Sequence, residues 1–142
     1  MHTVVIQKIS SQQTWAVRHP VLRKGRPVKD CIFKHDDDKS TLHFGAYQAM
    51  ILVGVVTLIV NSNGDFQLRG MAVLEPYQKF GIGAQLVRHL EDHVRKFYRG
   101  RIWMNAREIA VPFYLKLGYV ISGKPFDIPG IGAHYVMEKV LS

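Results

Sequence analysis

Hydrophobic and polar positions near the amino terminus predict a strand followed by a helix. Residues 3–9 are rich in Val and Ile, as is typical of a strand. Ser10 or Ser11 can cap a helix that starts directly after it. Pro20 and the glycine and proline residues that follow interrupt the helical pattern. We therefore expect this helix to be short or broken.

The next part of the chain predicts three strands joined by turns. Hydrophobic side chains alternate over residues 40–48, and Met50–Val60 is a β-branched run of the kind that is buried on both faces. These two strands follow each other closely and predict a hairpin. The Asn-Gly pair within residues 61–65 predicts a turn before a strand over Phe66–Leu74. Gly70 within that strand indicates a bulge or a close approach of the backbone.

An amphipathic helix is predicted from about Gly81 to Tyr98. Its apolar face follows spacings of four, four and three residues, at Leu86, Leu90, Val94 and Phe97. Its polar face would carry Arg88, Glu91, Asp92, Arg95 and Lys96.

The carboxyl-terminal part predicts three further strands around a short helix. Residues 101–106 are typical of a strand, and residues 110–118 predict a helix with Pro112 in its first turn. Residues 119–123 and 134–141 predict the last two strands. Strands and helices are mixed without regular β-α alternation, which predicts an α+β domain with a mixed sheet.

The composition favours one domain over residues 1–142. A chain of 142 residues with 47% hydrophobic content has enough apolar side chains for a single core. The longest apolar run is too short to cross a bilayer, and the amino terminus lacks the pattern of a signal peptide. One cysteine, Cys31, suits a buried thiol in a reducing compartment. We therefore expect a soluble, cytoplasmic protein with no membrane partner.

The formal net charge of +8 predicts attraction to something acidic. Charge alone does not distinguish nucleic acid, a membrane surface or a phosphorylated small molecule. The aromatic motif of RNA-binding sheets and the spacing of zinc fingers are both missing, so nucleic acid is the weaker alternative. The basic stretch from Arg18 to Lys29 indicates ordinary solvated charge, or a contact with phosphate or an acidic partner.

A glycine-containing loop joins the strand that ends near Leu74 to the amphipathic helix. Its sequence, KFGIG, lets backbone N–H groups converge on an anion at the positive end of a helix. Side chains at Gly81 and Gly83 would block the approach of a pyrophosphate. Walker A is absent, and Leu86 replaces the third glycine of the dinucleotide fingerprint. The remaining alternatives are another phosphate loop, or glycines that only ease a tight turn.

Two separate segments resemble the GCN5-related N-acetyltransferase (GNAT) family. Residues 78–84, QKFGIGA, match the Q/R-x-x-G-x-G/A signature of that family, and a strand precedes them as expected. The segment NAREIAVPFYLKLGY, residues 105–119, is similar to the family's downstream strand end and short helix. The resemblance covers nearly the whole chain. It implies a single-domain α+β fold in which helices flank a central, twisted, mixed and mostly antiparallel sheet.

The resemblance also implies acetyl-CoA as the acetyl donor and assigns residues to it. Backbone amides of the signature loop would bind the pyrophosphate, at Gln78, Lys79, Phe80, Gly81, Ile82, Gly83 and Ala84. Met71 and Val73 would flank the pantetheine arm like an added strand, near a bulge, and the Val73 amide would polarise the thioester carbonyl. Asn105 matches the family asparagine near the arm, and Tyr114 matches the tyrosine near the sulfur. Lys79 departs from the glycine of many relatives and adds a cation.

Acetyl transfer to an amine needs a base, a donor for the oxyanion and an acid. A lysine-like amine has a pKa of about 10.4 and must lose a proton before it attacks. Glu75 is the candidate base, with a solvated carboxylate as the alternative. The Val73 amide is the candidate oxyanion donor. Tyr114 is the candidate acid, with a core aromatic as the alternative. No covalent enzyme intermediate is required.

Other polar clusters give weaker predictions. His35–Asp38, sequence HDDD, indicates a solvated loop, and could attract a positively charged amine. His89 and His93 lie one helical turn apart but do not form HExxH, which favours a polar helix face over a zinc site. No metal is therefore expected. The expected partners are acetyl-CoA and an amine acceptor on a small molecule, peptide or protein, with a homodimer through the strand after Gly118 left open.

Two other functions remain open beside the N-acetyltransferase. One is a regulatory domain that binds CoA without turnover, and the other is a basic nucleic-acid-binding module. Only the acetyltransferase explains both matching segments.

Overall fold

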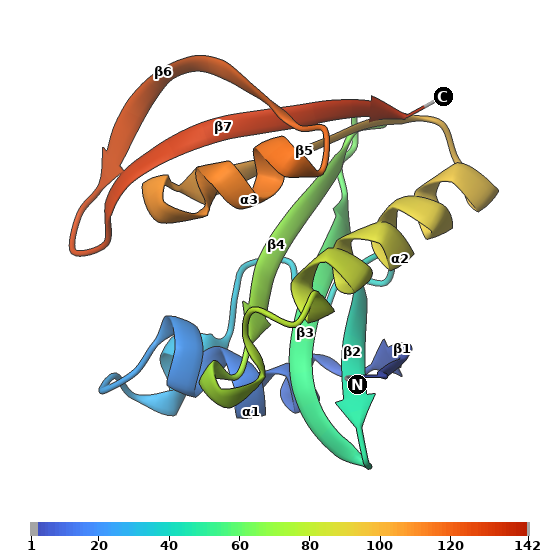
Figure 1. Cartoon of the computed structure of the whole chain (residues 1–142). Coiled ribbons are helices and arrows are strands. Elements are labelled where there is room, and N and C mark those ends of the chain that lie inside the picture. Colours follow the sequence, from blue (N-terminus) through green and yellow to red (C-terminus); the bar gives the residue numbers. More distant parts are fainter. Residues whose placement is uncertain (1–2, 142) are drawn as a thin grey trace.

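The computed structural model describes residues 3–141, whose strands form one seven-stranded sheet (Figure 1). The strands are β1 (Val5–Ile9), β2 (Leu42–Gln48), β3 (Ile51–Val60), β4 (Phe66–Val73), β5 (Gly100–Arg107), β6 (Val120–Ile128) and β7 (Gly132–Leu141). Their order across the sheet is β1-β2-β3-β4-β5-β7-β6. The pair β4 and β5 is parallel, and the other five pairs are antiparallel. The prediction of a mixed and mostly antiparallel sheet is confirmed.

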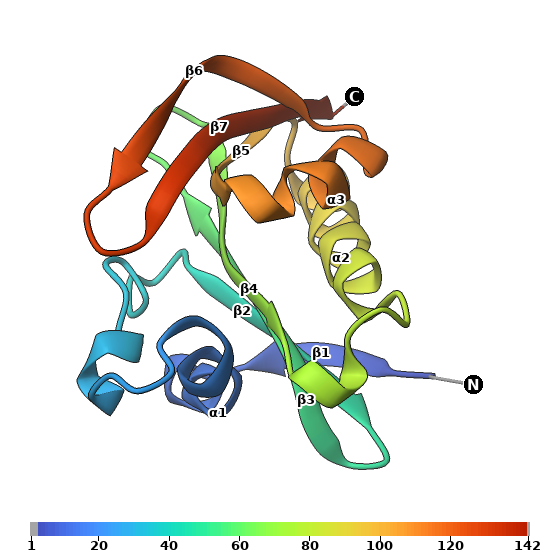
Figure 2. The same ribbon diagram turned by 60° about the vertical axis from the view of Figure 1, so that its left-hand side comes forward.

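Helices cover both faces of the sheet. The three α-helices of the described residues are α1 (Ser11–Leu22), α2 (Ile82–Phe97) and α3 (Val111–Lys116), and the 3₁₀ turns are η1 (Val28–Cys31), η2 (Glu75–Tyr77) and η3 (Glu108–Ala110). Figure 2 shows α1 on one side of the sheet and α2 with α3 on the other. The larger core cluster includes side chains of α2 and α3, and the smaller one includes Val17 of α1. We call these two sides the α2 face and the α1 face.

Helix α1 is continuous through Pro20 and ends at Leu22, before Gly25, so of the two alternatives the helix is short and not broken. Ser10 is the N-cap, and it forms a capping box in which Gln13 and Ser10 each accept from the other's backbone N–H. Pro20 lies in the last turn and is exposed, so its ring interrupts only the end of the helix. Burial of Val17 and Arg18 against the sheet holds the remainder in place.

The two predicted turns form as hairpins. The β2–β3 turn uses Ala49 and Met50, both with positive φ (48° and 68°), the backbone of a type I′ turn that Asn-Gly usually supplies. The β3–β4 turn closes with the Asn61 N–H donating to the Asp65 carbonyl at 2.8 Å, and Gly64 takes the positive φ. The Asn-Gly pair predicted the position of the second turn, whereas the residues of the first turn carry no such signal.

Strand β4 is bulged and loses contact with β5 early. The register with β3 shifts between Val55 and Thr57, opposite Gly70, which has a φ of 63°. Pairing with β5 is confined to Phe66 and Gln67. Figure 1 shows the two strands diverging beyond that point. The remaining residues of β4 have no strand partner on this edge within residues 3–141, and the Val73 carbonyl there accepts from the Gln78 side chain instead.

Helix α2 follows its predicted apolar stripe, with two corrections. Leu86, Leu90 and Val94 are fully buried, but Phe97, the last residue of the helix, is 60% exposed. Glu91 was expected on the polar face and is buried instead. Its carboxylate accepts from the Tyr119 hydroxyl at 2.8 Å and from Lys139 at 3.2 Å, partners that lie far along the chain.

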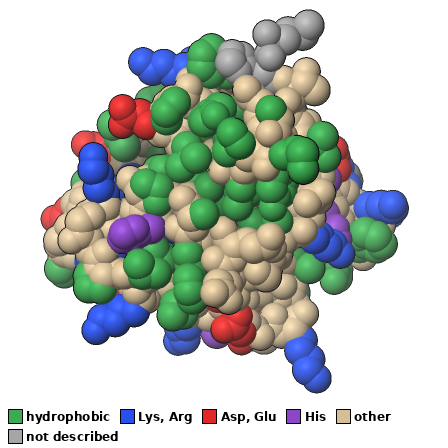
Figure 3. Space-filling model, turned by 90° about the horizontal axis from the view of Figure 1, so that it is seen from below, with side chains coloured by type: hydrophobic (Ala, Val, Ile, Leu, Met, Phe, Trp, Pro, Cys, Tyr) green, Lys and Arg blue, Asp and Glu red, His purple; other side chains and the backbone are tan. Residues whose placement is uncertain are grey.

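The lower end of the molecule in Figure 1 exposes apolar side chains. Val5 at the start of β1 and Met50 and Ile51 at the β2–β3 turn are each more than half exposed. Figure 3, viewed from below, shows hydrophobic side chains gathered near the middle of this face, with basic ones mostly toward the rim. No helix within residues 3–141 combines the length and the apolar character needed to span a membrane.

Candidate functional site

The signature loop presents backbone N–H groups at the start of α2. Lys79 and Gly81 both have positive φ (70° and 83°), which turns the chain sharply between η2 and the helix. Gly81 is the N-cap of α2 and supplies no side-chain acceptor to the first turn. A Cβ at Gly81 would meet open space, so glycine is needed there for its backbone conformation. These features leave the first-turn amides available to an anion.

Gly83 brings the two matching segments together. A Cβ at this position would lie 3.2 Å from Cζ of Phe113 in α3 and 3.4 Å from Cε of Met71 in β4. We expected glycine here because a side chain would obstruct a ligand. The structure adds a second reason, since a side chain would also press on the Phe113 ring. The loop, the bulged strand and the short helix adjoin one another at this glycine.

The main chain of Val73 faces away from β3. The Leu74 N–H donates to the Val53 carbonyl at 2.8 Å, and main-chain groups alternate in direction along an antiparallel strand. The N–H and carbonyl of Val73 therefore point toward the edge that β5 has left. The Gln78 side chain donates from Nε2 to that carbonyl at 2.8 Å. This contact ties the signature loop to the end of β4.

Tyr114 lies in the core beside this loop. Its side chain is 5% exposed and packs in edge-to-face geometry against Phe113 and Tyr119, with ring centres 5.0 and 5.8 Å away. Burial raises the pKa of the Tyr114 hydroxyl well above its usual range, so the proton is retained. Among the described residues the hydroxyl has no hydrogen-bond partner. A bound ligand could therefore receive its proton.

The other predicted site residues lie at the margin of this region. Glu75 is exposed at the first position of η2, between the end of β4 and the signature loop. Asn105 is exposed on β5, beyond the point where β4 separates. Phe80 is 48% exposed and Lys79 is exposed. The structure thus places Gly83 close to Met71 and Phe113 and leaves Glu75 and Asn105 toward solvent.

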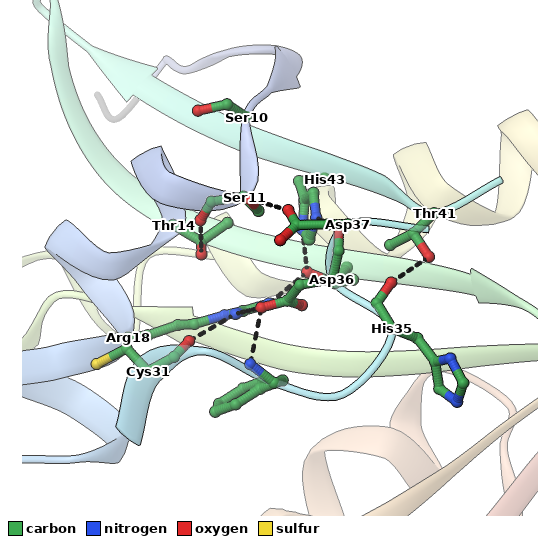
Figure 4. Close-up of polar contacts among 12 residues, drawn as sticks. Ser10, Ser11, Thr14, Arg18, Cys31, His35, Asp36, Asp37, Thr41 and His43 are labelled. Atoms are coloured by element: carbon green, nitrogen blue, oxygen red, sulfur yellow. Dashed lines mark hydrogen bonds and ion pairs between the residues drawn. The ribbon is translucent and has the colours of Figure 1, made fainter. Parts of the chain in front are cut away.

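A buried ion pair organises the α1 face. Arg18 is fully buried and donates to both carboxylate oxygens of Asp36, at 2.6 and 3.1 Å (Figure 4). Its guanidinium also donates to the Cys31 carbonyl and to the Thr57 hydroxyl, both at 2.9 Å. His43 bonds Thr57 and the Asp36 carbonyl oxygen. This network fastens the segment that precedes β2 onto the sheet.

The same network corrects the interpretation of His35–Asp38. Asp36 is 5% exposed and is already neutralised by Arg18, so it is neither solvated nor free to attract an amine. Asp37 accepts from the Ser11 hydroxyl at 2.6 Å, and Asp38 pairs with His35 at 2.7 Å. The described residues contain no group of three His, Cys, Asp or Glu side chains that could hold a metal ion. His89 and His93, expected on a polar face, are half-buried beside Phe44.

Two surface cavities lie outside the signature loop. The larger, of about 560 Å³, lies on the α1 face between the β3–β4 turn and β5, where Trp103 and Arg101 line it with His35 and Asp38. The smaller, of about 480 Å³, lies between β1 and the end of α2. Neither cavity is lined by a predicted donor-site residue.

Comparison with known proteins gives the chain a family. It matches the acetyltransferase (GNAT) domain over residues 10–141. The chain belongs to the GNAT acetyltransferase family. The uncharacterised N-acetyltransferase YitI of Bacillus subtilis (strain 168) is 33% identical over 142 residues, which cover 96% of this chain and 95% of that protein. Family membership confirms the resemblance and identifies the chain as a member of an acyltransferase family.

Solved structures of GNAT proteins share this fold. The ribosomal-protein-S18-alanine N-acetyltransferase from Escherichia coli superposes with a TM-score of 0.82 at 19% identity, covering 99% of this chain and 95% of that chain. A Bacillus subtilis acetyltransferase in complex with CoA gives a TM-score of 0.73 at 16% identity, covering 99% and 100%. The predicted α+β GNAT-like fold is confirmed.

Sequence reasoning missed Arg69, Arg107 and His134 on the α1 face of this GNAT domain, and it included Arg23 only as part of a basic stretch. Arg69 and Arg107 follow the separation of β4 and β5, and Arg23 caps the end of α1. His134 of β7 is buried opposite Arg107, with Nδ1 bonded to the Gly132 carbonyl oxygen at 2.8 Å. No local motif marks these positions, because their meeting depends on the strand order.

Proposed function

We propose that the chain is an acetyl-CoA-dependent N-acetyltransferase that transfers an acetyl group to a primary amine by direct attack. Family membership supports the acyltransferase chemistry. Two proteins of similar fold, an aminoglycoside 6′-N-acetyltransferase and a Bacillus subtilis acetyltransferase, were solved with CoA bound. The observation that carries the proposal is the meeting of Gly83, Met71 and Phe113, which joins the signature loop, the free edge of β4 and the helix of Tyr114.

The signature loop fits the pyrophosphate of the donor. Amides of Gly81 to Ala84 at the uncapped start of α2 would bind it, and the exposed Lys79 would add a positive charge. The unpaired edge of β4 beyond Gln67 offers main-chain groups of Met71 and Val73 to the pantetheine arm, with Asn105 across the gap on β5.

Tyr114 would act as the general acid. Burial raises the pKa of Tyr114, so its hydroxyl carries a proton at neutral pH, as that of an ordinary tyrosine also does, and its buried position limits competing water. The departing thiolate would take this proton. The free hydroxyl supports this assignment, since a purely structural buried tyrosine usually finds a partner for its O–H.

The remaining chemistry falls to Val73 and Glu75. The Val73 N–H, directed away from β3, would stabilise the charge that develops on the thioester oxygen. Glu75, exposed beside the end of β4, would accept a proton from the amine, directly or through water. Neither step requires a covalent enzyme intermediate or a metal ion.

Thermal unfolding with and without acetyl-CoA tests the donor site. A ligand that binds only the folded state at 100 times its Kd stabilises it by about 2.7 kcal/mol, enough to raise the Tm visibly. Gly81→Glu should abolish this stabilisation, because it adds a negative side chain among the anion-binding amides. Gly130→Glu is the matched control: Gly130 also has positive φ (78°) with open space at its Cβ, but it lies in the β6–β7 turn.

Release of free thiol from acetyl-CoA in the presence of amines then tests turnover. We expect stabilisation in the wild type and in Gly130→Glu, its loss in Gly81→Glu, and acetylation of an amine. No Tm shift in the wild type at millimolar acetyl-CoA would refute the proposal. Binding without transfer to any amine would instead support a regulatory domain that binds CoA.

A further inference from the structure

Three arginines from separate elements converge on the α1 face. Arg23 follows α1, Arg69 lies on β4 and Arg107 ends β5. The guanidinium carbons of Arg23 and Arg69 lie 4.8 and 4.9 Å from the centre of the buried Phe33 ring. Arg23 and Arg107 donate to the same carbonyl oxygen, that of Leu22, at 2.9 and 3.5 Å. We call Arg23, Arg69 and Arg107 the arginine cluster.

The charge of the arginine cluster is only partly balanced within residues 3–141, by the Asp36 carboxylate near Arg69. None of its members forms a salt bridge there, and the nearby Asp36 carboxylate is held by Arg18 and by the Phe33 N–H. Each guanidinium has five N–H donors. Arg23 and Arg107 each use one donor on the Leu22 carbonyl, and Arg69 uses none. Capping the end of α1 therefore accounts for few of these donors.

The unpaired donors of Arg69 are reachable from solvent. The buried side-chain atoms that lack a partner among the described residues are Nε1 of Trp15, Nε of Arg18 and Oε1 of Gln48, and none belongs to the arginine cluster. Burial lowers the pKa of Arg69, the Asp36 carboxylate raises it, and the adjacent Arg18 lowers it again. Burial and its neighbours Arg107, Arg26 and Arg69 likewise lower the pKa of Arg23. A bound anion would relieve this repulsion.

The arginine cluster lies beside the predicted acetyl-transfer region but across the sheet from the signature loop. Leu68 and Met71 pack in the α2-face core, whereas Arg69 contacts Phe33 on the other face. Both Arg69 and Arg107 lie beyond the last β4–β5 pair. A strand rises about 3.3 Å per residue, so Arg69 lies roughly 13 Å from Val73 along β4. A small molecule can bridge this distance.

We propose that the arginine cluster binds an anionic group of the acceptor, so that the acceptor is a small amine that also carries a carboxylate or a phosphate. This inference is carried by the juxtaposition of Arg23, Arg69 and Arg107 where β4 and β5 separate. This inference rests on the proposed function, because it takes the acceptor to be an amine that receives an acetyl group from a donor bound on the α2 face. It replaces the expectation of an acidic pocket at His35–Asp38 with one of opposite charge.

Calorimetric binding of matched amine pairs tests this proposal, in the presence and absence of CoA. The carboxylate pairs are ω-amino acids of two to six carbons and their carboxamides, and the phosphate pair is phosphoethanolamine and ethanolamine. We expect at least one anionic member to bind about tenfold or more tightly than its neutral partner. Which pair shows the preference distinguishes carboxylate from phosphate.

Variants locate the preference. Arg69→Gln and Arg107→Gln should each weaken binding of the preferred anion about tenfold and leave binding of its neutral partner unchanged. Arg99→Gln is the control. Arg99 is exposed between α2 and β5, so its substitution removes the same charge without changing the arginine cluster. Thermal unfolding would verify that each variant folds and that acetyl-CoA still stabilises it.

The outcomes separate this inference from the proposed function. Equal binding of charged and neutral partners, an equal effect of Arg99→Gln, or no binding of any anionic member at 10 mM or below (roughly −2.7 kcal/mol) would overturn the arginine-cluster proposal while leaving acetyl-CoA binding intact. If acetyl-CoA does not stabilise the wild-type protein, only the acetyltransferase proposal is refuted, because binding of the amine pairs does not require turnover.

Discussion

The two faces of the sheet offer different kinds of binding group. On the α2 face, the polar groups near the signature loop are mainly backbone amides, set beside an apolar core that contains Tyr114. On the α1 face they are guanidinium groups: Arg18 forms an ion pair with Asp36, whereas no member of the arginine cluster forms a salt bridge within residues 3–141. A backbone site persists through most side-chain changes, whereas a side-chain site can be removed one residue at a time. The contrast is therefore open to test by substitution.

The largest effect is expected for Asp36→Asn, which would leave Arg18 charged and unpaired in the interior. Arg18 is fully buried, and removing one partner of a buried ion pair costs about 3–5 kcal/mol. Urea unfolding should therefore show a markedly lower midpoint for this variant. Asp37→Asn is the control, because Asp37 is exposed and accepts only from Ser11, so its change should stay within about 0.5 kcal/mol. Similar midpoints for the two variants would mean that the buried pair does not hold this face together.

The next largest effect is expected for Tyr114→Phe, the side-chain change that matters most on the α2 face. Loss of a general acid should lower the rate of acetyl transfer about 100-fold or more, while the Tm shift produced by acetyl-CoA is retained. Because burial raises the pKa of Tyr114, its ionisation should cause no decline in the wild-type rate up to about pH 10. The neighbouring Tyr119→Phe is an unsuitable control, since the Tyr119 hydroxyl bonds the buried Glu91.

Tyr135→Phe is a better matched control for the acid. The Tyr135 hydroxyl is on β7 and makes one long bond to Glu108, at 3.4 Å. Its removal should change the transfer rate less than threefold, or about 0.6 kcal/mol. Equal rates for wild type and Tyr114→Phe would exclude the acid role and leave Tyr114 as a core aromatic.

The sequence predicted features that are encoded locally. The glycine loop is contiguous, and the apolar spacing of α2 appears within one segment, so both were predicted before the fold was known. Pro20 shows the limit of a local rule, because tertiary packing carries α1 through it. Ala49 and Met50 show another, since the pairing of β2 with β3 imposes a turn that their residue types do not favour.

Features made by distant partners could not be predicted in this way. The burial of Glu91 depends on Tyr119 and Lys139, and that of Asp36 on Arg18, 18 residues earlier. The arginine cluster gathers residues from three elements because β4 and β5 separate after two pairs. Charge counting indicated an acidic partner for the protein but could not say which basic residues would be left unneutralised by folding.

The smallest effect on stability is expected for Arg69→Gln, and its size distinguishes the arginine cluster from the Arg18–Asp36 pair. The Arg69→Gln variant loses the contact with the Phe33 ring, worth about 0.5–1 kcal/mol, and the attraction to Asp36, but relief from burial and from repulsion by Arg18 offsets that loss. We therefore expect the free energy of unfolding to change by less than about 0.5 kcal/mol, measured by urea unfolding beside Asp36→Asn. A loss of about 2 kcal/mol or more would make Arg69 part of the folded framework, like Arg18. A near-neutral result would mean that the fold does not need this charge, as expected of an arginine whose donors are available to a ligand.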